Sequence, residues 1–258
     1  MGNVSSRLGI FPKKSLMFKF LICTTVLAYG IYGASGHGMV VDPPNRASRW
    51  REDWEAPANY DDNGLFCGGM SVQFGQNGGK CGLCGDNYAD ATPRTYELGA
   101  TPFGEGIIVR KYTPGSVMYV RVLVTANHMG SFAFNLCSLD KFKEENEDCF
   151  EDILLKQITG ESSYVIDERT GYFDVLLQLP SDLSCEHCIL QWTWTTGNSW
   201  GDCGNGVGEV GCGTTQETFR TCSDISVLIF RTPPPLLNLV LKNYFIYFIL
   251  CNSHFTSK

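Results

Sequence analysis

His37 follows a segment with the layout of a secretory signal peptide. Residues 20–32 form a compact apolar run behind lysines, and Ala34 and Gly36 put small residues at the third and first positions before His37. If cleavage falls there, the mature chain begins with histidine. Its free α-amine and its imidazole then offer a metal two nitrogens from one residue, and imidazole is a favoured ligand for copper, zinc and iron. The alternative is that histidine is first by chance, so a metal site requires a second ligand downstream.

His128 is the best second ligand among the four histidines, which are His37, His128, His187 and His254. It ends a β-type run and begins a turn, and a strand end on a rigid sheet can hold a ligand accurately. A lone histidine there is more often structural. With His37 it permits a site of one amine and two rings, a T-shaped set of three nitrogens that suits Cu(II) and can also hold Cu(I).

The chain divides into three parts. We expect residues 1–36 to be a removed signal peptide, with Met17 as an alternative start that gives a leader of ordinary length. Residues 37–231 are expected to form one extracellular domain. The tail, 232–258, contains an apolar run at 236–251 that is shorter than a comfortable membrane span. It is either a marginal membrane anchor or a non-native or alternatively spliced end, and it indicates no function.

The domain contains ten cysteines, and an even number in an exported chain predicts up to five disulfides of open connectivity. These are Cys67, Cys81, Cys84, Cys137, Cys149, Cys185, Cys188, Cys203, Cys212 and Cys222. Two CxxC pairs raise the alternative of zinc. They lie further apart than in most structural zinc sites, so disulfides are favoured. His187 is then predicted to be a surface histidine beside a bridge.

The charge balance limits the partners. A net charge of −7 and a pI near 5.1 argue against nucleic acid, which needs a concentrated basic patch. They also give no reason to expect an anionic membrane or polymer, whereas a neutral substrate is compatible. We expect a monomer, with a membrane contact only if the tail anchors it.

Short β-type runs begin after a loop region that is rich in glycine, proline and aromatic residues. The expected strands are 107–112, Val117–Ala126, 132–137, 172–179 and 188–195. Pro114-Gly115 predicts a hairpin between the first two, and short helices are expected near 46–55 and within 142–158. Strands at this spacing indicate an all-β, immunoglobulin/fibronectin III-like antiparallel β-sandwich with long disulfide-stapled loops.

Four segments resemble the lytic polysaccharide monooxygenases, and in particular the animal branch of their chitin-binding type-4 group, auxiliary activity family fifteen. The segments are the His37-Gly38 start, 125–128 (TANH), 190–201 (LQWTWTTGNSWG) and 216–225 (QETFRTCSDI). The resemblance runs from His37 to about Val227, which is nearly the whole predicted domain. It therefore marks residues 37–231 as a copper monooxygenase domain of the chitin-binding type-4 group.

The resemblance implies a copper site held by His37, through its amine and ring, and by His128 through its ring. Phe219 falls where the family places an axial aromatic residue, and it has no oxygen to ligate. The implied catalytic set is His37, His128, Phe219 and Glu217, with Ala126, Trp192, Trp194 and Phe219 around the metal. Trp192 and Trp194 are equally explained as core residues on one strand face. The sequence indicates no particular substrate-binding residue.

The resemblance also implies a secreted enzyme that oxidises a glycosidic carbon of crystalline chitin, with cellulose as a second candidate substrate. It would need one copper ion cycling between Cu(II) and Cu(I), an external reductant, and O₂ or H₂O₂. A two-histidine site independently leaves coordination positions open for an oxidant. The alternatives are a non-catalytic carbohydrate-binding or cuticle-associated protein, and a copper-carrying or structural secreted protein with no glycan role. Hydrolysis would need two opposed carboxylates, and no pair stands out.

Overall fold

The computed structural model describes residues 37–204 and 206–229. The expected signal peptide, the alternative start at Met17 and the tail 232–258 lie outside the described residues. Within the described ranges, no helix is long and apolar enough to cross a membrane.

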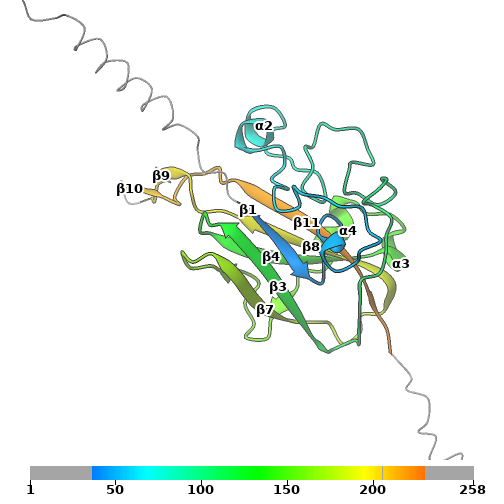
Figure 1. Ribbon diagram of the computed structural model, residues 1–258. Coiled ribbons are helices and arrows are strands. Elements are labelled where there is room, and N and C mark those ends of the chain that lie inside the picture. The colour runs from blue at the N-terminus through cyan, green and yellow to red at the C-terminus, as the bar shows by residue number, and fades with distance from the viewer. Residues whose placement is uncertain (1–36, 205, 230–258) are drawn as a thin grey trace, which may run out of the picture. The chain divides into compact units, whose positions relative to one another are not determined.

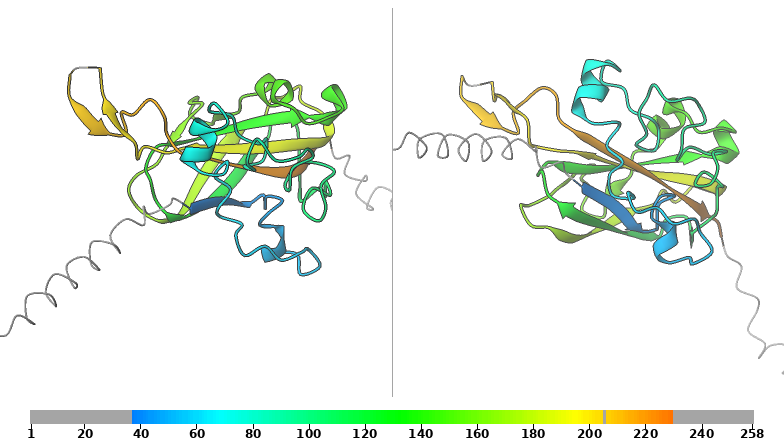
Figure 2. Two further views of the ribbon diagram at one scale, coloured as in Figure 1. Left: turned by 90° about the horizontal axis from the view of Figure 1, so that it is seen from above. Right: turned by 45° about the horizontal axis from the view of Figure 1, so that its top comes forward.

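Two β-sheets face each other across a common core (Figures 1 and 2). The first has the order β1 (His37–Asp42), β3 (Val117–Ala126), β7 (Gly171–Gln178) and β5 (Lys156–Gln157). The second has the order β2 (Arg110–Tyr112), β11 (Thr218–Val227), β8 (Cys185–Thr195), β4 (Ser131–Ser138) and β6 (Tyr164–Val165). Every neighbouring pair is antiparallel except β2 with β11. The predicted β-sandwich is therefore confirmed.

The core forms because alternate residues of each strand point inward. In β3 the buried positions are Met118, Val120, Val122 and Val124, and in β7 they are Phe173, Val175 and Leu177. From the other sheet, β4 and β8 contribute Phe132, Phe134, Leu136, Leu190, Trp192 and Trp194. Because β8 is also buried on its other face, the loops must cover the outside of this sheet.

Long loops and short helices supply that cover. The helical segments are η1 (Arg49–Arg51), α2 (Met70–Gly75), α3 (Leu139–Phe142) and α4 (Glu147–Asp152). A second buried cluster beneath them contains Cys84, Cys137, Cys149, Phe150, Ile189 and Cys222. A small hairpin of β9 (Trp200–Asp202) and β10 (Gly208–Val210) projects from the end of the sandwich at which β1 begins (Figures 1 and 2).

All ten domain cysteines form disulfides, as the sequence predicts. The pairs are Cys67–Cys81, Cys84–Cys222, Cys137–Cys149, Cys185–Cys188 and Cys203–Cys212. Only one of the two CxxC pairs closes on itself, because Cys84 instead reaches β11. The loop region is thus tied to β11 of the second sheet.

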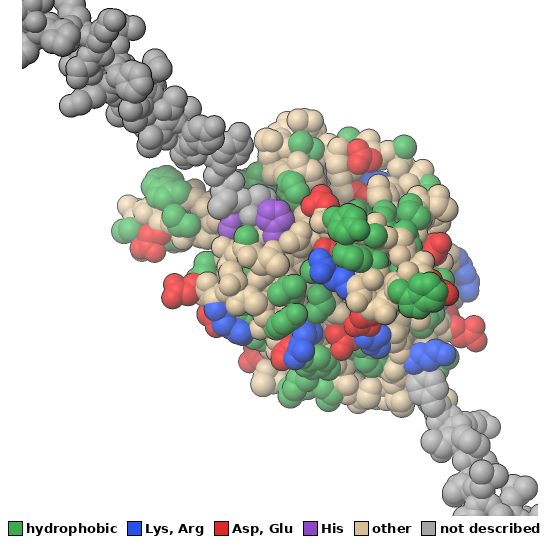
Figure 3. Space-filling model, in the orientation of Figure 1, with side chains coloured by type: hydrophobic (Ala, Val, Ile, Leu, Met, Phe, Trp, Pro, Cys, Tyr) green, Lys and Arg blue, Asp and Glu red, His purple; other side chains and the backbone are tan. Residues whose placement is uncertain are grey.

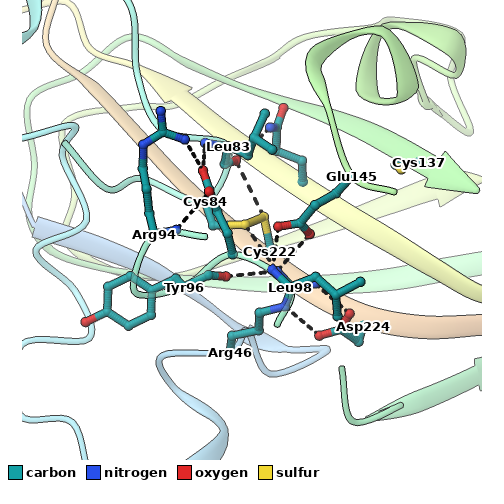
Figure 4. Close-up of polar contacts among 12 residues, drawn as sticks. Arg46, Leu83, Cys84, Arg94, Tyr96, Leu98, Cys137, Glu145, Cys222 and Asp224 are labelled. Carbon is teal, nitrogen blue, oxygen red and sulfur yellow. Dashed lines mark hydrogen bonds and ion pairs between the residues drawn. A yellow bond between two sulfur atoms is a disulfide. The ribbon is translucent and has the colours of Figure 1, made fainter. Parts of the chain in front are cut away.

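A buried ion cluster reinforces that tie (Figure 4). Arg46 forms two hydrogen bonds with the Asp224 carboxylate, at 2.7 and 2.8 Å, and a third with Glu145 at 2.9 Å. Burial alone would raise the pKa of Asp224, but hydrogen bonds and charge attraction from Arg46 and His187 outweigh it and hold that pKa below its ordinary value. This network fixes the 43–48 turn against β11. Pairing each buried charge with an opposite charge offsets the cost of removing it from water.

Three expectations about elements need correction. β2 does not form a hairpin with β3 across Pro114-Gly115, because it pairs in parallel with β11 in the opposite sheet. It is also shorter than the expected strand 107–112. The helix expected near 46–55 is only the single 3-10 turn η1, since ion pairs and the Arg46 contacts set the conformation of that loop.

Candidate metal centre

His37 and His128 meet at one end of the first sheet. His37 is the first residue of β1 and lies opposite Ala126 of β3. His128 follows two residues after Ala126, where β3 has ended. Figure 3 shows histidine side chains side by side on this surface. The two ligands implied by the sequence are thus neighbours, and the residue opposite His37, Ala126, has a small side chain.

The ring of His128 is held from behind by polar groups. Its Nδ1 lies 3.0 Å from Glu217 Oε2 and 2.6 Å from Asn198 Nδ2. The side chains of His128 and Glu217 are 11% and 9% exposed, so this contact is largely shielded from water. A carboxylate on one ring nitrogen is the usual support of a metal-binding histidine, and it directs the other nitrogen, Nε2, to the metal.

Aromatic side chains form the floor beneath the pair. Phe219 of β11 is fully buried and stacks on Trp194 with ring centroids 4.9 Å apart. A Cβ on Gly38 would lie 3.2 Å from the Trp194 ring, so the residue after His37 rests directly on that ring. Phe219 and Trp194 can therefore exclude water from the inner side of the site.

Trp192 lies deeper than Trp194 on the same face of β8. It is fully buried and packs on Phe132 with ring centroids 5.3 Å apart. The structure thus places Trp192 in the core of the sandwich, whereas Trp194 reaches the strand end that carries His128.

The turn after His128 depends on a glycine. Gly130 has φ +89°, and a Cβ there would lie 2.1 Å from the Thr195 carbonyl oxygen. Met129 before it also has a positive φ, of 57°. Its carbonyl accepts a hydrogen bond from Trp194 Nε1 at 2.7 Å, while the His128 carbonyl accepts one from the Gly197 N–H at 2.8 Å. This tight turn fixes the backbone of His128 against β8.

The donor types near His37 and His128 are those that copper prefers. Among the described residues, no group of three or more His, Cys, Asp and Glu side chains is arranged to hold a metal ion. The two imidazoles, with the α-amine that cleavage before His37 would create, are a smaller set of donors, and nitrogen ligands of this kind suit copper. Two cavities of about 490 and 520 Å³ lie elsewhere and include no histidine.

Sequence reasoning missed some residues around this centre. Asn198 belongs to the 190–201 motif, but the motif alone does not indicate its contact with His128, because that contact depends on the turn that follows β8. His187 does lie beside the Cys185–Cys188 bridge, but it is not simply a surface residue. Its Nε2 lies 2.7 Å from the buried Asp224 carboxylate.

Comparisons with known proteins identify relatives of this chain. A model of a family described as "Lytic polysaccharide mono-oxygenase, cellulose-degrading" matches residues 37–225. The solved structure of a lytic polysaccharide monooxygenase AA15 from Thermobia domestica in the Cu(I) state is 42% identical, with a TM-score of 0.69. The match covers 74% of this chain and 99% of that one.

Structures with low sequence identity to this chain carry no argument about its family. A chitin-binding domain from Burkholderia pseudomallei is 12% identical, with a TM-score of 0.41, and the match covers 75% of this chain and all of that one. A search of curated proteins found no significant match. The family match spans most of the chain and starts at His37, so this chain belongs to the lytic polysaccharide monooxygenases, enzymes that oxidise polysaccharides.

Proposed function

We propose that this chain is a secreted, copper-dependent lytic polysaccharide monooxygenase that cleaves crystalline chitin, with cellulose as the second candidate. The observation that carries the proposal is the pairing of His37 with Ala126, which brings His37 beside His128 while Glu217 supports the His128 ring. The start of the family match at His37 supports removal of residues 1–36.

The proposed ligands are the His37 amine and ring together with Nε2 of His128. Copper bound there would supply one-electron redox chemistry toward O₂ or H₂O₂ with electrons from an external reductant. Glu217 accepts the hydrogen on Nδ1 of His128 and so keeps Nε2 free for the metal. Phe219 has no oxygen to offer, and with Trp194 and Ala126 it keeps water and other ligands off the inner side.

The β9–β10 hairpin is the proposed substrate contact. Trp200 is 70% exposed, and its ring lies so close to Gly208 that a Cβ there would be 2.0 Å from it. The Cys203–Cys212 bridge staples the hairpin. A fixed, solvent-facing indole suits stacking on the apolar face of a sugar ring, and it lies two residues from Asn198, which touches His128.

Chitin is preferred because of the resemblance to the animal branch of the chitin-binding type-4 group, while the matching family is described as cellulose-degrading. The two polymers carry the same backbone linkage, so product analysis must separate them. Oxidised oligosaccharides from chitin, dependent on copper and reductant, are the expected products. Binding to chitin without any oxidised product would instead favour the non-catalytic carbohydrate-binding alternative.

The sharpest test is to retain one residue before His37. An acylated nitrogen cannot serve as the amine ligand, so a protein that begins Met-His37 should fold normally but lose tight copper binding and oxidative activity. Calorimetry measures copper affinity, and mass spectrometry measures the products and verifies the extension. Release of oxidised chito-oligosaccharides at the native rate by the extended protein would refute the proposed site.

A further inference from the structure

Nδ1 of His128 has two polar neighbours that make opposite demands. Glu217 Oε2, at 3.0 Å, accepts a hydrogen from this nitrogen, whereas Asn198 Nδ2, at 2.6 Å, donates one to it. A ring nitrogen of a neutral imidazole either carries a hydrogen or offers a lone pair. Nδ1 therefore satisfies only one of these two partners in the arrangement observed.

The same atoms permit two arrangements, and only one of them satisfies both Glu217 and Asn198. In the first, the ring hydrogen is on Nε2 and the Asn198 amide N–H donates to Nδ1. In the second, the hydrogen is on Nδ1, and both Glu217 and the amide oxygen of Asn198 accept it. A half-turn of the amide, whose oxygen and nitrogen have nearly the same shape, together with loss of the Nε2 hydrogen to solvent and uptake of one at Nδ1, converts the first arrangement into the second.

The far end of the amide allows either orientation. The other amide atom of Asn198 lies 2.8 Å from Thr196 Oγ1, and a hydroxyl both donates and accepts. Thr196 is buried, at 2% exposure, and its backbone N–H bonds to the Glu217 carbonyl at 3.0 Å. The segment that carries Asn198 is thus fixed to the residue that also supports the ring.

We propose that Asn198 is a positioning residue that selects the tautomer of His128. This inference rests on the proposed copper function, because only the second arrangement leaves Nε2 free for copper. Asn198 then contributes a second acceptor for Nδ1–H beside Glu217 and fixes the rotation of the ring about its bond to Cβ. Copper binding and the orientation of this amide are therefore linked.

Substitutions at position 198 separate this role from simple packing. Asn198→Ala removes the acceptor and should weaken Cu(II) binding by about 10-fold or more, the usual range for an outer partner of a metal-binding histidine. Asn198→Asp can only accept, so at pH 8 it should retain near-native copper affinity. Ser199→Ala is the matched control, because the Ser199 hydroxyl reaches Met70 Sδ rather than the histidine.

Calorimetry gives the copper affinity, electron paramagnetic resonance reports the ligand geometry, and thermal unfolding without copper reports the fold. We expect an altered spectrum for Asn198→Ala, spectra close to native for Asn198→Asp and Ser199→Ala, and similar unfolding midpoints for all. Native affinity and spectrum in Asn198→Ala, or an equal loss in Asn198→Asp, would overturn this inference while the copper site stands. Failure of the native protein to bind copper would instead overturn the proposed function itself.

Discussion

The two histidines with carboxylate partners have different tasks, which single substitutions can separate. His128→Ala removes a proposed metal ligand at a strand end, so copper affinity should fall by more than about 100-fold, beyond the usual effect of an outer partner. The free energy of unfolding should fall by only about 1–3 kcal/mol, the cost of leaving the buried Glu217 carboxylate without this partner. Calorimetry with Cu(II) and denaturant unfolding measure the two effects.

His187→Ala is the matched comparison. It removes a partner of the buried Asp224, so it should lower the free energy of unfolding while copper affinity stays native. If the two variants bound copper equally well, the assignment of His128 as a ligand would be wrong.

Asp86 is a buried carboxyl with a pH signature. Its Oδ2 has no hydrogen-bond partner among the described residues, and burial, with the nearby Glu97 charge, raises its pKa from 3.8 to about 6. Between these two values the folded protein binds more protons than the unfolded chain, so this residue makes stability fall as pH rises from about 4 to 6.

Asp86→Asn removes that pH dependence, because the amide does not ionise. The free energy of unfolding of the variant minus that of the native protein should be larger at pH 8 than at pH 4. The expected increase is about 1–2 kcal/mol after allowance for solvent screening. Denaturant unfolding at the two pH values measures the difference. Asp182→Asn, at an exposed position, should show no such change. Equal behaviour of the two variants would contradict the buried-charge explanation.

At the scale of elements, the β9–β10 hairpin is expected to set polysaccharide affinity. Trp200→Ala should weaken binding to crystalline chitin several-fold, because one aromatic platform is worth about 1 kcal/mol. Copper affinity should be unchanged, since Trp200 is not a ligand. A pull-down isotherm with insoluble chitin measures the effect. Trp54 is 88% exposed in a different loop and provides the matched control. An equal loss in Trp54→Ala would show that the contact is not specific to the hairpin.

The sequence predicts where a strand begins and ends better than it predicts which other strand it pairs with. The alternation in Val117–Ala126 gave this strand its observed bounds, because inward and outward residues differ in polarity. The pairing of β2 with β11 could not be predicted, since the partners are more than a hundred residues apart and alternation does not encode the neighbour. Likewise His37 and His128 were identifiable by residue type, while the contact of Asn198 with His128 exists only through the turn that joins β8 to β9.

At the scale of the whole molecule, the disulfides should differ in their contribution to stability. Cys84–Cys222 spans 138 residues and Cys203–Cys212 spans 9. Chain-entropy arguments give about 5 kcal/mol for the long loop and about 2.6 kcal/mol for the short one. Replacing both cysteines by serine should therefore lower the unfolding midpoint more for the first pair. A larger loss for the hairpin bridge would show that strain or residual structure outweighs loop entropy.

The same long bridge determines what happens when the chain is cut. Residues 158–163 form an exposed loop that a protease can reach. A break at Gly160 leaves one piece with His37 and His128 and another with Glu217 and Phe219. Cys84 lies on the first piece and Cys222 on the second, so the nicked domain stays one covalent molecule. It should run as two fragments on a gel only after reduction, and it should keep its ligands and their support together.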